Sequence, residues 1–142
     1  MNGLGDKDRS KKGNDTIKMV SFKKVFDEAL KLHSTGNISE AIKNYNFLLN
    51  NGFNDPRIFV NYGNILKDLG KLKDAELSYR KAIDLKPEIV EAQSNYATIL
   101  RDLGKLKEAE LSYRKAINLK PDFAEIHFNL GSTLKDLGKL KD

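Results

Sequence analysis

One 22-residue segment of this 142-residue chain occurs twice, 34 positions apart, with only three differences. The copies are residues 66–87 (LKDLGKLKDAELSYRKAIDLKP) and 100–121 (LRDLGKLKEAELSYRKAINLKP), and the first nine residues return at 134–142. A fixed period of this length indicates units that stack in a row, because each unit buries its apolar face only against the next. Such a stack presents a continuous surface, so the period favours a binding scaffold over an enzyme with an enclosed pocket.

Each unit begins with a predicted helix. We set the units at 22–55, 56–89, 90–123 and an incomplete 124–142. Positions 4, 7, 8 and 11 of a unit are then apolar or small, and in the second unit they are Phe59, Tyr62, Gly63 and Leu66. This spacing of three and four residues is typical of one face of a helix. The small residues at position 8 (Gly63, Ala97 and Gly131) are expected to let a second helix approach closely.

A turn and a second helix complete the unit. The glycine at position 15 is suited to the left-handed conformation that ends a helix, and it recurs as Gly70, Gly104 and Gly138. Ala75, Tyr79 and Ala82 follow at helical spacing. Pro87 and Pro121 close the second helix, because proline cannot continue a helix interior. No strand pattern occurs, so the expected fold is all-α.

These positions resemble the tetratricopeptide repeat. The family pattern has a large residue at 4, Leu-Gly at 7–8, aromatics at 11 and 24, Gly at 15, Ala at 20 and 27, and Pro at 32. The second unit matches it with Phe59, Tyr62, Gly63, Gly70, Ala75, Tyr79, Ala82 and Pro87. The third keeps most positions but has Gln93 at position 4, and the first is looser. The resemblance covers residues 22–142 and implies a right-handed α-solenoid of helix-turn-helix repeats.

The first residues differ in composition from the rest. Residues 1–17 contain Gly, Asn, Asp and Lys and almost nothing apolar. A segment that cannot bury apolar surface does not compensate the entropy of ordering. We therefore predict a disordered basic tail at 1–17 and a repeat domain at 18–142.

Composition excludes several classes of protein. Cysteine is absent, so there is no disulfide framework, and no apolar run has the length of a membrane span or signal peptide. We therefore expect cytoplasmic residence and no membrane partner. The net charge of +5 does not imply nucleic acid, because the recurring Lys and Arg residues alternate with Asp and Glu and form no single-sign stripe.

Catalysis has few candidates in this sequence. The two histidines, His33 and His127, occupy different repeat positions, and His127 is expected to pack in the core. No metal-binding, nucleophile or phosphate-loop motif is present. We therefore expect no enzyme activity, no catalytic residue, no metal and no cofactor.

The face opposite the core is the candidate site. At about 100° per residue, positions 2, 5, 6, 9 and 13 lie together, and in the resembling family this face lines the concave groove. Asparagine occupies position 6 in three units, and a carboxamide both donates to and accepts from a peptide backbone. The predicted peptide-binding residues are Asn61, Asn64, Asp68, Asn95, Thr98, Asp102, Asn129, Ser132 and Asp136.

Two functions remain open. The asparagine row is similar to that of the repeat superhelix of protein O-linked N-acetylglucosamine transferases. The chain is thus either a scaffold for a protein or extended peptide, or the substrate-recruiting arm of a larger enzyme such as a glycosyltransferase. The carboxylate clamp of co-chaperones is not matched, because Val60 and Glu125 stand where it needs cations. Recent duplication also explains the repeated asparagines without any function.

The last unit has no second helix. Its first helix is expected to carry Ile126, Leu130, Leu134 and Leu137 on a face without a partner. An uncovered apolar face favours association. The alternatives are a truncated longer chain and self-association through this end.

Overall fold

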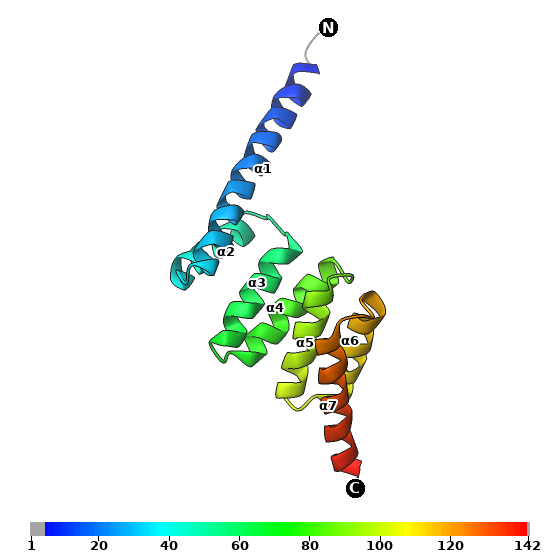
Figure 1. Cartoon of the computed structure of the whole chain (residues 1–142). Helices are drawn as coiled ribbons and strands as arrows, with labels where there is room; N and C mark the ends of the chain where they lie inside the picture. The colour runs from blue at the N-terminus through cyan, green and yellow to red at the C-terminus, as the bar shows by residue number, and fades with distance from the viewer. Residues whose placement is uncertain (1–4, 142) are drawn as a thin grey trace. The chain divides into compact units, whose positions relative to one another are not determined.

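The computed structural model describes residues 5–141, with side chains for 11–139, and every element in the described residues is an α-helix (Figure 1). This confirms the predicted all-α class. Two compact units divide the chain at Asn54. The first contains α1 (Gly5–Ser34) and α2 (Ile38–Asn50). The second contains α3 (Pro56–Asp68), α4 (Leu72–Leu85), α5 (Val90–Asp102), α6 (Leu106–Leu119) and α7 (Ala124–Lys141).

The predicted glycine turns form wherever a second helix follows. Gly36, Gly70 and Gly104 have φ angles of +82°, +73° and +79°, a conformation that only glycine adopts without strain. Two nested backbone hydrogen bonds close each turn. At Gly70, its N donates to the carbonyl oxygen of Lys67 at 2.9 Å, and the N of Lys71 donates to the carbonyl oxygen of Leu66 at 2.8 Å. Each helix therefore stops at a defined residue, and the next one runs back along it.

The prediction for Gly138 is wrong, because α7 continues through it to Lys141. In the earlier copies, Ala75 and Tyr79 or Ala109 and Tyr113 pack back on the first helix and are fully buried. That packing stabilises the reversal of the chain. No such helix packs behind Gly138 in the described residues, so the helical backbone bonds continue.

The segment predicted as a disordered tail is helical over residues 5–17, which belong to α1. Residues 11–21 are exposed, and burial begins at Phe22 and continues at Phe26 and Ala29. The packed part nucleates the helix, and adding further turns to a nucleated helix costs little. Residues 1–4 of the predicted tail lie outside the described residues.

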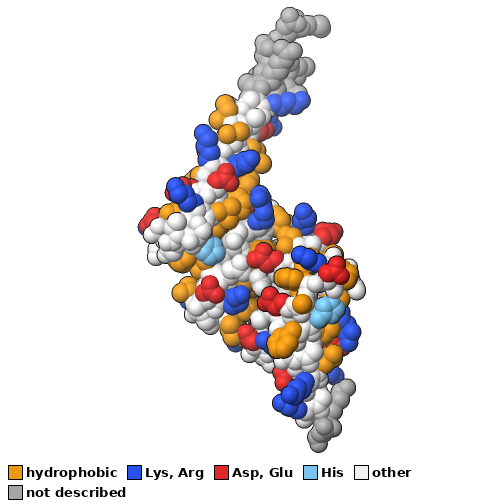
Figure 2. Space-filling model, viewed as in Figure 1, with side chains coloured by type: hydrophobic (Ala, Val, Ile, Leu, Met, Phe, Trp, Pro, Cys, Tyr) orange, Lys and Arg blue, Asp and Glu red, His pale blue; other side chains and the backbone are white. Residues whose placement is uncertain are grey.

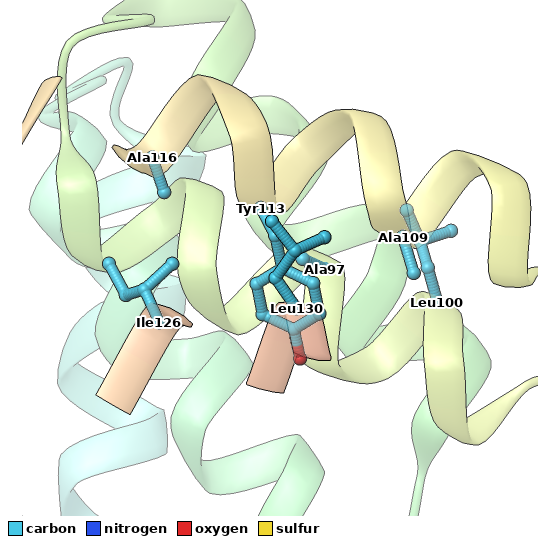
Figure 3. Close-up of a cluster of buried hydrophobic side chains, with 7 residues drawn as sticks. All are labelled: Ala97, Leu100, Ala109, Tyr113, Ala116, Ile126 and Leu130. Carbon is cyan, nitrogen blue, oxygen red and sulfur yellow. The ribbon is translucent and has the colours of Figure 1, made fainter. Parts of the chain in front are cut away.

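In the second unit, successive helices pack in sequence order: α3 on α4, α4 on α5, α5 on α6 and α6 on α7. Figure 3 shows one of the resulting clusters, in which the Tyr113 ring lies among small and aliphatic side chains of three helices. Its members are Ala97, Leu100, Ala109, Tyr113, Ala116, Ile126 and Leu130. The small residues bring the helices close around the ring.

Position 8 behaves as predicted at Gly63, where a second helix packs on the first. A Cβ atom added to Gly63 would lie 2.7 Å from Cε1 of Tyr79, which is closer than such atoms approach. Ala97, at the same position of α5, is fully buried beside Tyr113. A Cβ added to Gly131 would meet nothing within 4 Å, since the described residues contain no second helix on this side of α7.

The face of α7 that was predicted to lack a partner is buried in one part and exposed in another. Ile126 and Leu130 are buried against α6, and Leu134 is exposed. His127, expected in the core, is exposed too, and its Nε2 lies 2.6 Å from the carbonyl oxygen of Pro121. The preceding helix therefore covers one side of α7, and the side that would face a following helix is open.

Candidate functional site

The predicted groove residues lie on neighbouring helices. Helix α3 contacts α5, and α5 contacts α7, so the same position of consecutive first helices recurs along one surface. Each of the nine predicted residues is exposed or half-buried. Val60, which the helical spacing also placed on this face, is instead buried, and Phe128 at the same position of α7 is exposed.

Asn64 is the centre of a hydrogen-bond network in this surface. Its Oδ1 accepts from the hydroxyl of Tyr79 at 2.6 Å and from Nδ2 of Asn95 at 3.0 Å. Its Nδ2 donates to Oε1 of Glu91 at 3.1 Å. A carboxamide oxygen has two lone pairs, so two accepted hydrogen bonds satisfy it. Asn64 therefore joins α3, α4 and α5, and its oxygen is already used within the protein.

Thr98 occupies the equivalent place one repeat later. Its Oγ1 lies 2.9 Å from the hydroxyl of Tyr113 and donates to the carbonyl oxygen of Ser94 at 3.1 Å. In both repeats, a polar side chain at position 9 thus bonds the tyrosine 15 residues later. Tyr79 and Tyr113 are fully buried, so the position-9 side chains bond hydroxyls that water does not reach.

The row at position 6 keeps more of its hydrogen-bonding capacity. Asn95 uses one amide hydrogen on Asn64, and Asn61 uses one on the carbonyl oxygen of Arg57 at 2.8 Å. Within the described residues, Asn129 makes no side-chain hydrogen bond, and no donor bonds Oδ1 of Asn61 or Asn95. A carboxamide offers two donors and two acceptor sites, so these three residues retain partners for a ligand.

Carboxylates lie near Tyr79 and near Tyr113, the two tyrosines that bond position-9 side chains. Burial raises the pKa of Tyr79, and the nearby charges of Glu91 and Asp68 raise that pKa further. Burial also raises the pKa of Tyr113. The hydrogen bond between Tyr113 and Thr98 and the charge of Arg101 oppose this rise, and the charges of Asp102 and Glu125 add to it. The acidic residues at positions 13 and 2 therefore lie near the position-9 side chains in both repeats. Elsewhere, Figure 2 shows charges of both signs interspersed on the face it presents.

The tyrosine-to-position-9 bond is the functional feature that the sequence interpretation missed. The recurring 15-residue separation between a polar residue and a tyrosine was present in the sequence as Asn64 with Tyr79 and Thr98 with Tyr113.

The described residues contain no group of acidic, histidine or cysteine side chains that could hold a metal. None of their helices combines the length and the apolar character needed to span a bilayer.

Comparisons with known proteins agree with this repeat geometry. A model described as "Tetratricopeptide repeat" matches residues 56–89, and one described as "TPR repeat" matches residues 97–138. No curated protein matches the chain in sequence. The second unit, α3 to α7, contains both matched segments.

Several solved structures share the fold. The first TPR of Spaghetti (RPAP3) bound to the HSP90 peptide SRMEEVD is similar with a TM-score of 0.76 and 23% identity, over 82% of this chain and 93% of that one. The type III secretion chaperone SycD of Yersinia enterocolitica, in complex with a peptide of the translocator YopD, gives 0.72 and 23%, over 86% and 95%. The Sgt2 TPR domain from Aspergillus fumigatus gives 0.74 and 19%, over 85% and 82%. At these identities the similarity shows the fold.

Proposed function

Because this chain is built of tetratricopeptide repeats, we propose that it is a scaffold that binds an extended peptide segment along α3, α5 and α7. The observation that carries the proposal is the row at position 6. Asn61, Asn95 and Asn129 stand one repeat apart on neighbouring helices, and each retains carboxamide groups that the protein does not use. Similar folds hold peptides, as in the complexes of RPAP3 and SycD.

The contacts would be made to the peptide main chain. A carboxamide that donates to a carbonyl and accepts from an N–H can pair with any residue of an extended ligand. Each such bond contributes about 0.5–1.5 kcal/mol net, so three in a row give affinity without strong sequence selection. Asn64 has a different role, because its oxygen already serves Tyr79 and Asn95, and it positions the row.

Charge gives the groove a preference for cationic ligands. Glu91 and Asp68 lie near Tyr79, and Asp102 and Glu125 lie near Tyr113. A ligand with Lys or Arg would gain complementary charge along this surface. An acidic peptide such as SRMEEVD, which the RPAP3 domain binds, lacks that complementarity here. The alternative of a glycosyltransferase arm rests on the asparagine row alone.

A peptide-display selection against the full chain tests the proposal. We expect the selected extended peptides to be rich in Lys and Arg. Asn95→Ala and Asn129→Ala should each weaken their binding up to about tenfold, to a similar degree for peptides of different sequence. Asn118→Ala is the matched control, because this exposed asparagine lies on α6 and should change nothing.

Each variant is checked by circular dichroism before binding is measured. Asn64→Ala should lower stability as well as binding, because it removes the acceptor of the buried Tyr79 hydroxyl. Equal affinities of the wild type, Asn95→Ala and Asn129→Ala for the same peptides would contradict a role of the asparagine row. Selection of acidic peptides would contradict the charge preference.

A further inference from the structure

A cavity of about 560 Å³ lies between α4, α5 and α6, at the C-terminal ends of α4 and α6. Ile83, Pro87 and Leu119 give it apolar walls, and Gln93 of α5 is the buried residue of its lining. No residue of α7 and none of the asparagine row at position 6 lines it. A hollow of this size with apolar walls and few polar groups is typical of a ligand site.

Gln93 brings an unused hydrogen-bond acceptor to this cavity. The residue is 4% exposed, and its Nε2 donates to the carbonyl oxygen of Pro87 at 3.2 Å. Within the described residues, no donor bonds its Oε1. The Tyr45 hydroxyl is the one fully buried side-chain N or O atom without a partner in that part of the chain, so Oε1 of Gln93 is reachable from the cavity.

The contact with the proline carbonyl explains only one end of the Gln93 side chain. It recurs in the next repeat, where Nε2 of His127 lies 2.6 Å from the carbonyl oxygen of Pro121. That contact accounts for the NH₂ group of Gln93, because a carboxamide nitrogen donates and its oxygen accepts. The oxygen is left for a ligand that can donate to it.

The lining favours an aromatic group that carries a hydrogen-bond donor. An aliphatic or phenyl group would fill the apolar part and leave Oε1 of Gln93 desolvated without a donor. An indole has a large apolar body and a single N–H, which donates and does not accept. Lys115 also lines the cavity, and an ammonium group is attracted to the face of an indole ring. This sequence contains no tryptophan, so a second copy of it could not supply the indole.

We propose that this cavity binds a tryptophan side chain of a partner protein, flanked in that protein by basic residues. The indole packs on Pro87 and Leu119, and its N–H donates to Oε1 of Gln93. Asp84 and Glu88 line the cavity and are exposed, so they pair with Lys or Arg on either side of the tryptophan. Free indole would leave both carboxylates without a partner. The proposal does not rest on the proposed function, because the two sites share no residue.

The peptide acetyl-Lys-Trp-Lys-amide is the probe. Its fluorescence reports binding without background, because the protein contains no tryptophan. We expect saturable binding to the full chain, with the emission shifted to shorter wavelength as the indole leaves water. Leu119→Ser removes an apolar wall and should weaken binding several-fold. Leu85→Ser is the matched control and should change nothing, because Leu85 is exposed at the same position one repeat earlier and does not line the cavity.

The hydrogen bond to Gln93 has its own test. A peptide with 1-methyltryptophan keeps the ring and lacks the N–H, so it should bind the wild type several-fold more weakly than the tryptophan peptide. Gln93→Met removes the acceptor, and the two peptides should bind this variant alike once circular dichroism shows that it is folded. Equal losses on methylation in both proteins would overturn the assignment of Gln93.

Two comparisons identify the source of the indole and the site. N-acetyltryptophanamide lacks the lysines and should bind at least about tenfold more weakly than the peptide, and the difference should shrink in the double variant Asp84→Asn with Glu88→Gln. Equal binding of both compounds to the wild type would overturn a partner segment as the ligand. Asn95→Ala should leave binding of the probe unchanged. Loss of binding in Asn95→Ala but not in Leu119→Ser, or no shift of the emission, would overturn the cavity as the site.

Discussion

Replacing Tyr45 by phenylalanine should stabilise the protein, although the same change at Tyr79 should destabilise it. The Tyr45 side chain is 0% exposed, and its hydroxyl is buried without a hydrogen-bond partner in the described residues. Tyr79 and Tyr113 bond Asn64 and Thr98, each 15 residues earlier. The residue 15 positions before Tyr45 is Leu30, which has no polar atom to offer.

The magnitudes follow from the state of each hydroxyl. A buried polar group left without a partner costs about 1–3 kcal/mol, and phenylalanine removes the hydroxyl while keeping the ring. Tyr45→Phe should therefore raise the free energy of unfolding by about 1 kcal/mol or more. Tyr79→Phe removes a made hydrogen bond and should lower that free energy by about 0.5–1.5 kcal/mol.

Leu30→Asn tests the cause. In a double-mutant cycle with Tyr45→Phe, we expect a coupling energy of about 1 kcal/mol. Leu30→Asn should give a higher free energy of unfolding when residue 45 is tyrosine than when it is phenylalanine, because only tyrosine can bond the asparagine. The cycle cancels the cost of replacing the half-buried leucine. A coupling energy of zero would show that Leu30 does not occupy the place of Asn64.

The assay is equilibrium unfolding in urea, followed by circular dichroism, with native-state hydrogen exchange of the helix amides. Tyr45 and Tyr79 lie in different compact units, so exchange reports the effect in α2 separately from that in α4. A loss of stability in Tyr45→Phe equal to that in Tyr79→Phe would refute the reasoning.

Two further predictions use the same contacts. Gly63→Leu should lower the free energy of unfolding by about 1–3 kcal/mol or more, because the new side chain strikes the Tyr79 ring. Gly131→Leu should raise that free energy by up to about 1 kcal/mol through helix propensity, because an added Cβ there meets nothing within 4 Å. Equal effects of the two changes in urea unfolding would contradict this difference in packing. Burial raises the pKa of Tyr45 to about 12, above the ordinary value of a tyrosine. Ionisation of Tyr45 therefore leaves the free energy of unfolding unchanged below pH 10 and lowers it between pH 10 and 12, by up to about 2–3 kcal/mol, because the unfolded chain loses this proton first. Alkaline unfolding followed by circular dichroism should show a smaller loss in Tyr45→Phe, and an unchanged curve would contradict this assignment.

The 34-residue period made most of the fold predictable. A repeated pattern tests each assignment more than once, so Gly70 and Gly104, the buried Tyr79 and Tyr113, and the helical faces could be read from spacing alone. The close approach at Gly63 followed from the same logic, because a small residue at a fixed position predicts a large neighbour.

The candidate site was predictable only in part. Helical spacing placed Asn61, Asn95 and Asn129 on one surface, but it could not show that Asn64 bonds Asn95 and Tyr79. Hydrogen bonds between helices depend on the distance and rotation of neighbouring repeats, which a single-helix projection omits. The sequence therefore suggested position 9 for ligand binding, whereas in the structure Asn64 and Thr98 at this position bond the hydroxyls of buried tyrosines.

Residues 66–74 and 134–142 have the same sequence, LKDLGKLKD, yet they form different structures. The first copy turns at Gly70 with φ +73°, and the second continues as helix through Gly138. Since the local propensities are equal, the difference comes from packing: fully buried Ala75 and Tyr79 stabilise the turn in the first copy.

Appending the sequence of residues 75–86 (AELSYRKAIDLK) directly after Asp142, in register with the earlier repeats, should therefore convert Gly138 into a turn residue. For this, the free energy gained when the added tyrosine packs on Gly131 has to exceed the free energy of the helical hydrogen bonds lost beyond Leu137. The contact of Tyr79 with Gly63 has this effect after Leu69 in the earlier repeat. Carbon-13 chemical shifts of Gly138 should change from helical values to those of a left-handed residue, matching Gly70 in the same spectrum. The shifts should remain helical when the added tyrosine is alanine. If Gly138 stayed helical in the fused wild type while the added segment formed its own helix, tertiary packing would not be what sets the turn.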